Sequence, residues 1–174
     1  NNSFASDILA NAFEGLMTYD TETGSLICGE AESYTVSDDG LVYTFTLRDG
    51  LKWSDGSDHT AADYVYAIKR ILDPATGAKY VDLVAAYIAG AAEYYAGETD
   101  DFDTVGIKAP DDKTVEITLY NPTSFFADIL TMWTFDPVQA ATIEANGDKW
   151  TSSPDTYVSN GPFYVTDMKL GESI

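Results

Sequence analysis

The chain has 174 residues, the length of one domain, and its 9 Lys and Arg against 29 Asp and Glu give a net charge of −20 at pH 7. Hydrophobic residues make up 45% and aromatic residues 13%, which excludes an intrinsically disordered chain. An acidic surface repels phosphate groups, which disfavours nucleic-acid binding and attachment to anionic lipid through a basic patch. No apolar run reaches the roughly 20 residues of a membrane-spanning helix, and we expect no signal peptide in this sequence because no basic and then apolar segment opens it.

Cysteine and histidine are scarce. Cys28 and His59 are single residues of their kinds, which leaves no intrachain disulfide, no multi-cysteine metal site and no His-His zinc site. A Cys28–His59 nucleophile is the remaining option of this type. Leu26 and Ile27 give Cys28 an apolar, strand-like setting, which favours a buried, inert thiol.

The first elements are a short helix and a turn. Residues 4–17 are mostly apolar and predict a helix with Ser3 or Ser6 as its N-cap. The stretch 20–24, with its Asp, Thr and Gly, predicts a turn.

A β-hairpin follows. Large apolar residues alternate with threonine over 43–47, the pattern of a half-buried strand. Residues 34–36 predict its partner, because 37–40 carry the Ser-Asp-Asp-Gly signal of a hairpin turn. Turns at Gly40, Gly50 and Gly56 each favour a positive φ, and the apolar Trp53 between the last two predicts a structural anchor.

Two helical stretches come next. Thr60 and Asp63 have the spacing of a capping box, and apolar residues then recur at helical spacing as far as Leu72. Asp73–Pro74 predicts the end of that helix. Residues 81–95 predict a second helix, broken near Gly90.

The remaining elements alternate between strand and helix. Residues 105–107 and 115–119 predict a strand pair joined by a turn at 109–112, while 124–132 and 137–145 predict helices. The stretch 160–165 predicts a tight turn that enters a strand. The elements do not follow a βαβ order, so the predicted fold class is α+β with a mainly antiparallel sheet and packed helices.

The acidic residues give few candidates for chemistry. Glu30 and Glu32 are a conceivable glycosidase-type carboxylate pair, but nothing in the sequence places them in a cleft. The acidic stretches 38–40 and 100–103 lack the twelve-residue pattern of an EF-hand calcium loop. We therefore interpret them as solvated turns and expect no metal site.

Tyr80 differs from the other aromatic residues, most of which have core spacing. It follows the Pro74–Lys79 stretch and lies outside the periodic helix. Exposed loop aromatics often contact ligands, although a loop tyrosine can also cover the core. Tyr80 is therefore a candidate ligand contact.

Several ordered motifs together resemble the family 5 extracellular solute-binding proteins, the oligopeptide- and dipeptide-binding components of ABC importers. They are FEGL at 13–16, AESYTVSDDG at 31–40, YTFTLRDGLKWSDG at 43–56, TAADYVY at 60–66, VGIKA at 105–109, TVEITL at 114–119, GDKW at 147–150 and SNGPF at 159–163. They cover almost the whole chain, which makes the resemblance specific.

The resemblance implies a part of a two-lobed fold of the periplasmic-binding-protein type. Residues 1–20 would be a flanking segment of the first domain, 21–150 the second domain, and 151–174 the re-entry into the first domain. The third domain, which holds the peptide amino terminus in relatives, would be absent from this sequence.

The resemblance also implies function. Such proteins bind a peptide between two lobes, close by a hinge motion and dock on the membrane permease, without catalysis or a cofactor. Tyr80, seven residues after Asp73, matches the position of a cleft tyrosine, and Ser3 matches a position that contacts the peptide main chain. Asn160 and Gly161 would lie next to the hinge. A monomer is expected, periplasmic or lipid-anchored at the outer face of the cytoplasmic membrane in the full-length protein.

Three alternatives stay open at this point. The same scaffold could bind another solute, such as a nickel complex or an oligosaccharide. The paired carboxylates could belong to an acidic extracellular enzyme. An acidic, aromatic-rich surface could also serve an adhesion or interaction domain.

Overall fold

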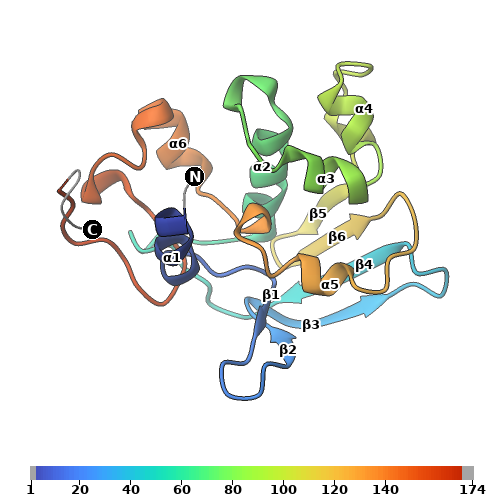
Figure 1. Cartoon of the computed structure of the whole chain (residues 1–174), viewed down its shortest axis with the longest axis horizontal. Helices are drawn as coiled ribbons and strands as arrows, with labels where there is room; N and C mark the ends of the chain where they lie inside the picture. The colour runs from blue at the N-terminus through green and yellow to red at the C-terminus, as the bar shows by residue number, and fades with distance from the viewer. Residues whose placement is uncertain (1–2, 170–174) are drawn as a thin grey trace.

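The computed structural model describes the backbone of residues 3–169 and the side chains of residues 7–169. Its elements are α1 (Ser3–Ala12), β1 (Met17–Tyr19), β2 (Leu26–Cys28), β3 (Ala31–Val36), β4 (Val42–Leu47), α2 (Ala61–Leu72), η1 (Pro74–Thr76), α3 (Val81–Tyr87), α4 (Ala91–Tyr95), η2 (Phe102–Thr104), β5 (Ile107–Asp111), β6 (Thr114–Thr118), α5 (Phe126–Ile129), η3 (Trp133–Phe135), α6 (Ala140–Asn146), η4 (Gly147–Lys149) and η5 (Pro154–Thr156). In Figure 1, α2, α3 and α4 lie over the sheet, while α1 and α6 lie at the other end of the molecule. No helix within the described residues is both long and apolar enough to cross a membrane.

The main sheet has four antiparallel strands in the order β3-β4-β6-β5, and β1 and β2 form a separate hairpin. Tyr43, Phe45 and Leu47 alternate along β4 on the buried side, where Val115 and Ile117 of β6 join them. The threonines between them are at least partly exposed on the opposite side. The strand prediction at 43–47, the hairpin and the α+β fold class are confirmed.

Helix α2 begins and ends where the sequence predicts. The Thr60 side chain accepts from the N3 backbone, and Asp63 accepts from the Thr60 N–H at 2.9 Å, which completes the capping box. Asp73 ends the helix in an extended conformation before Pro74. The buried side of α2, which includes Tyr64 and Ile68, belongs to the main core.

The predicted break near Gly90 separates α3 from α4. Gly90 has φ +71°, and a Cβ there would lie 2.3 Å from the Thr104 carbonyl oxygen. The chain therefore needs glycine at this point for both its conformation and its close approach to Thr104. Gly40, Gly50 and Gly56 have φ of +73°, +75° and +85°, as their turns predict.

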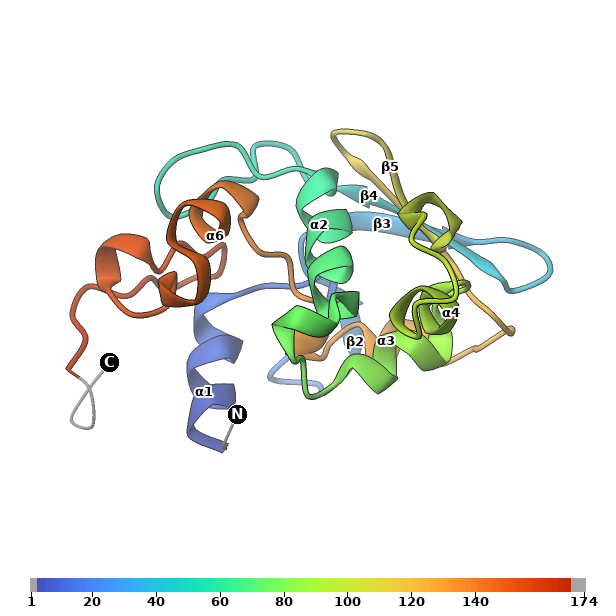
Figure 2. The same ribbon diagram turned by 90° about the horizontal axis from the view of Figure 1, so that it is seen from above.

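A second, smaller core joins the two ends of the described chain. Ala12, Phe13, Trp53, Tyr157 and Val158 are its buried members. Figure 2 shows the chain after α6 running beside α1. The anchor predicted at Trp53 is confirmed, since its side chain is 2% exposed within this cluster.

Helix α1 is shorter than the predicted 4–17. It ends at Ala12 because the carbonyl groups of Asn11 and Ala12 accept from Phe163 and Gly161, at 3.2 and 2.8 Å, and the chain turns away. The helix starts at Ser3, but the Ser3 and Ser6 side chains lie outside the described residues, so their capping role stays a prediction.

The predicted turn at 109–112 is misplaced. Strand β5 continues to Asp111 across an irregular register around Pro110, an arrangement that an edge strand tolerates. The turn lies at 112–113, where Asp111 accepts from the Lys113 N–H at 2.9 Å.

Three further predictions in the second half need correction. The helix predicted over 124–132 is limited to α5, Phe126–Ile129. The helix predicted from 137 begins at Ala140, because Gln139 has an extended backbone with φ −74° and ψ 116°. Its side chain donates to Asp55 and Ser57. Residues 163–168 form no strand.

We expect Gly90→Ala to destabilise the fold more than Gly97→Ala. Both glycines have positive φ, +71° and +73°, so each substitution carries the left-handed backbone cost of about 1–2 kcal/mol. A Cβ at Gly97 has nothing within 4 Å, whereas a Cβ at Gly90 overlaps the backbone of Thr104. Overpacking should therefore add about 1–3 kcal/mol for Gly90→Ala in denaturant unfolding. Equal losses for the two variants would contradict the close approach.

Candidate ligand-binding surface

Tyr80 lies at the end of the loop that leaves α2. Asp73 caps η1 by accepting from the Ala75 N–H at 2.9 Å, and Gly77 turns the chain with φ +61°. Tyr80 precedes α3 and is 41% exposed, as the sequence predicts for a loop aromatic. Its ring meets the Trp133 ring edge-on, with centroids 6.3 Å apart and an interplanar angle of 83°. The two rings together form an aromatic wall at the surface.

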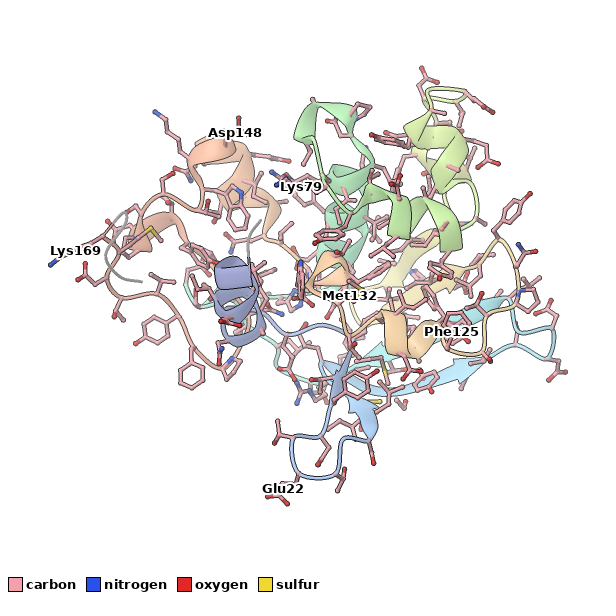
Figure 3. The ribbon with its side chains drawn as sticks, viewed as in Figure 1. Glu22, Lys79, Phe125, Met132, Asp148 and Lys169 are labelled. Carbon is pink, nitrogen blue, oxygen red and sulfur yellow. The ribbon has the colours of Figure 1, made fainter. Side chains whose placement is uncertain are left out.

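A pocket of about 360 Å³, named here the Tyr80 pocket, opens on one side of this wall. Arg70 and Lys79 line it together with Tyr80, Trp133 and Asp136. Figure 3 labels Lys79, on the loop between α2 and α3, and Met132, directly before η3. This pocket combines aromatic surface with two cationic side chains.

A second pocket of about 420 Å³, named here the Glu14 pocket, shares Trp133 and Asp136 with the first. Glu14 and Asn160 line its other end. The Asn160 side chain donates to the Glu14 carbonyl at 2.7 Å and accepts from the Glu14 N–H at 3.3 Å. Two segments 146 positions apart are thus held together at the lining of this pocket.

Asp136 is half-buried between the two pockets. A Cβ on Gly15 would lie 2.7 Å from its Oδ1, so the glycine leaves the space that the carboxylate occupies. Burial, with the nearby carboxylates of Glu30 and Glu14, raises the pKa of Asp136 to about 8. At neutral pH this carboxyl is mostly protonated.

A buried polar cluster lies behind this surface. His59 Nε2 is 2.7 Å from Glu30 Oε2, and Nδ1 is 2.8 Å from Asp63 Oδ2. Tyr64 donates its hydroxyl to Glu30 at 2.6 Å. Burial opposes the charged imidazole, but the hydrogen bonds and charges of Asp63 and Glu30 outweigh it and raise the pKa of His59 to about 9. His59 is therefore an imidazolium between two carboxylates.

This cluster separates the carboxylates that the sequence offered as a catalytic pair. Glu30 is 1% exposed and committed to His59 and Tyr64, whereas Glu32 is exposed. Cys28 is half-buried in β2 rather than fully buried, and it is not close enough to His59 for any hydrogen bond. Over the described part of the chain, no group of three or more His, Cys, Asp or Glu residues is arranged to hold a metal ion.

Of the predicted site residues, Tyr80 lies at the aromatic wall, and the Ser3 side chain lies outside the described residues. The sequence reasoning missed Trp133, Asp136 and Glu14, which come from separate segments. Glu14 was visible only as part of the FEGL motif. Nothing in the sequence around Trp133 or Asp136 distinguishes them from core residues.

The fold matches solved structures of oligopeptide-binding proteins. For a periplasmic oligopeptide-binding protein from Borrelia burgdorferi, the TM-score is 0.94 at 42% identity, covering 99% of this chain and 34% of that one. For Listeria monocytogenes OppA bound to peptide, the TM-score is 0.89 at 35% identity, covering 96% and 32%. The fold is therefore that of the periplasmic binding proteins.

The sequence comparisons define the family. The family model described as bacterial extracellular solute-binding proteins, family 5 Middle, matches residues 27–174. The oligopeptide-binding protein OppA of Bacillus subtilis (strain 168) is 39% identical over 175 residues, which cover 100% of this chain and 31% of that protein. The chain belongs to the family 5 extracellular solute-binding proteins, and it spans about a third of the length of these relatives.

We expect His59→Phe to cost about 3–5 kcal/mol of stability, because it leaves Glu30 and Asp63 without their shared counter-charge. Lys52→Met is the control, since the Lys52–Asp58 ion pair is exposed and worth at most about 1 kcal/mol. Chemical unfolding of the two variants at pH 6.5 gives the comparison. Similar losses would contradict the role of the cluster.

The same cluster predicts how stability depends on pH. The folded pKa of His59, about 9, exceeds its ordinary value of 6.5, so its contribution is complete below pH 6.5 and disappears as the pH rises through 9. Asp136 acts in the same direction, because its folded pKa of about 8 exceeds the ordinary 3.8. We expect the melting temperature to fall from pH 6.5 to 9, and to fall less steeply in His59→Phe. A melting temperature that rises over this interval would overturn the assignment.

Proposed function

We propose that this chain is part of the substrate-binding protein of an ABC importer, which captures oligopeptides or dipeptides outside the cytoplasmic membrane and delivers them to the permease. Membership of family 5 supports this, as do relatives named for oligopeptide binding. The single observation that carries it to particular residues is the Tyr80–Trp133 wall with a pocket on each side.

The chemistry of this surface suits peptides. Aromatic rings supply contact area that does not depend on ligand sequence, and open, partly polar pockets can keep water around variable side chains. A peptide can also be held in extended form through its main chain. Ser3 stays a proposed main-chain contact.

In this proposal, the described surface is one wall of a cleft and a second lobe supplies the other. Residues 21–150 form the second domain of the fold, flanked by first-domain segments at 1–20 and 151–174. Asn160 and Gly161 are proposed to lie beside the hinge, because they link the C-terminal segment to Glu14 and Ala12. Closure of the lobes would then bury the ligand.

The remaining proposals follow from the family. The protein is proposed to act by binding, without catalysis, as a monomer that docks on permease subunits. Its proposed location is the periplasm or the outer face of the cytoplasmic membrane with a lipid anchor.

Mass spectrometry tests the class of ligand. It uses the protein as its source organism produces it, purified under native conditions. We expect a ladder of masses that fragment as short peptides. A single mass corresponding to a sugar or a metal complex would change the proposed solute and leave the fold assignment unchanged. No bound mass, with no thermal shift in a peptide mixture, would argue against transport.

We expect Tyr80→Ala to weaken peptide binding about 5- to 30-fold, the usual effect of removing a buried aromatic contact. Tyr120→Ala is the matched control, because Tyr120 is 65% exposed and lines neither pocket. Isothermal titration with the same short peptide gives both affinities. Equal affinity for wild type and Tyr80→Ala would remove Tyr80 from the binding surface.

A further inference from the structure

The Glu14 pocket differs from the Tyr80 pocket in charge. Glu14 and Asp136 line it with Trp133, Thr131 and Asn160, and none of the described residues that line it is a lysine or an arginine. Arg70 and Lys79 line the other pocket, whereas Arg48, which pairs with Glu14 at 3.2 Å, lines neither pocket. A cationic group of a ligand is therefore favoured in the Glu14 pocket and repelled from the Tyr80 pocket.

Asp136 differs from the neighbouring acids in its polar contacts. The other acids of this region have partners: Glu30 has His59 and Tyr64, and Glu14 has Arg48 at 3.2 Å. Among the described residues, the Asp136 carboxylate has no hydrogen bond or ion pair. Partial burial of an acid without a partner is unfavourable, and a ligand that supplies a donor would remove that cost.

Trp133 completes the chemical character of this pocket. Its ring lies between the two pockets, and Tyr80 holds it edge-on. An indole ring attracts an ammonium or guanidinium group and packs along its aliphatic stem. Carboxylate and indole together make a surface that discriminates a cation from a neutral group of the same size.

We propose that the Glu14 pocket is a subsite for an ammonium or guanidinium group of the bound peptide, with Asp136 as its main counter-charge and Trp133 as its aromatic wall. This inference rests on the proposed function. The cation can come from a lysine or arginine side chain or from the peptide amino terminus, and the experiment separates the two.

Titration uses the protein as its source organism produces it, freed of bound ligand, at pH 7. Four tetrapeptides differ only in Lys against Gln at one position and in a free against an acetylated amino terminus. We expect the cationic group to improve affinity about tenfold or more, as a charge-assisted hydrogen bond does. Loss of affinity on acetylation would identify the amino terminus as the source of the cation. Loss of affinity when Lys is replaced by Gln would identify the side chain.

Asp136→Asn should reduce this preference to less than about threefold, with little change in affinity for the neutral peptide. Asp148→Asn is the matched control, because Asp148 is exposed on η4 and lines neither pocket. Figure 3 labels its position. The control should keep the wild-type preference.

A second measurement on the unaltered protein does not depend on how the variant folds. The groups that face Asp136 on one side are Glu14, Glu30 and Tyr64, with Arg48 and His59 bound to the two glutamates. On the other side, Arg70, Lys79 and Tyr80 line the Tyr80 pocket with it. Because the Asp136 carboxyl is mostly protonated at pH 7, a bound cation should drive release of about one proton, seen as a buffer-dependent binding enthalpy. The neutral, acetylated peptide should release none.

The outcomes are distinct. Equal affinity for cationic and neutral peptides, with no proton release, would overturn the subsite and leave peptide binding intact. A cationic preference that survives Asp136→Asn would also overturn it. No binding of any tetrapeptide would overturn the subsite together with the proposed function.

Discussion

The ion pairs of the His59 imidazolium fix the positions of the sheet, helix α2 and the smaller core relative to one another. The imidazolium joins Glu30, directly before β3, to Asp63 in the first turn of α2, and its ring lies 4.6 Å from the Trp53 ring in the smaller core. Carboxylates only accept, so both ring nitrogens must donate and the ring carries a charge. Such a buried group is tolerated only when its partners are also satisfied. Tyr64 donates to Glu30, and the Thr60 N–H and the Trp53 indole donate to Asp63.

The candidate binding surface depends on this arrangement through α2. Once the helix is fixed against the sheet, the loop at its C-terminal end places Tyr80 against Trp133. From the opposite side, Asn160 holds the main chain of Glu14, and Gly15 leaves room for Asp136. The wall between the two pockets is thus supported from both sides by residues that are far apart in the sequence.

The sequence predicts what nearby residues decide. The β3–β4 turn, the capping box of α2 and the break at Gly90 depend on residues within a few positions, and the structure confirms them. The ends of α1 and α6 depend on distant contacts, with Gly161 and with Asp55, so the predicted limits are wrong there. Periodicity contains no information of this kind.

The candidate site likewise has a part that local sequence predicts and a part that depends on distant residues. Glu30 was interpreted together with Glu32, two positions away, but its partner is His59, 29 positions away. The spacing of His59 and Asp63, four positions apart across the start of α2, was an available signal. The capping box already accounted for Asp63, which serves both roles. Its loop position and the family resemblance made Tyr80 a candidate, which stays a prediction. Nothing in the sequence indicated Trp133 or Asp136, which become candidates only through the two pockets that they line.

Glu30 and Asp136 are neighbouring acids with different surroundings. Glu30 is enclosed, and the fold provides it with a cation and a hydroxyl donor within 2.7 Å. Asp136 reaches a pocket, and the fold provides it with neighbouring negative charge instead, so it retains its proton. An acid whose partner is built in stabilises the scaffold. An acid at a pocket wall, left without a partner, makes the local charge responsive to whatever enters the pocket. This difference separates the scaffold from the candidate binding surface in the present fold.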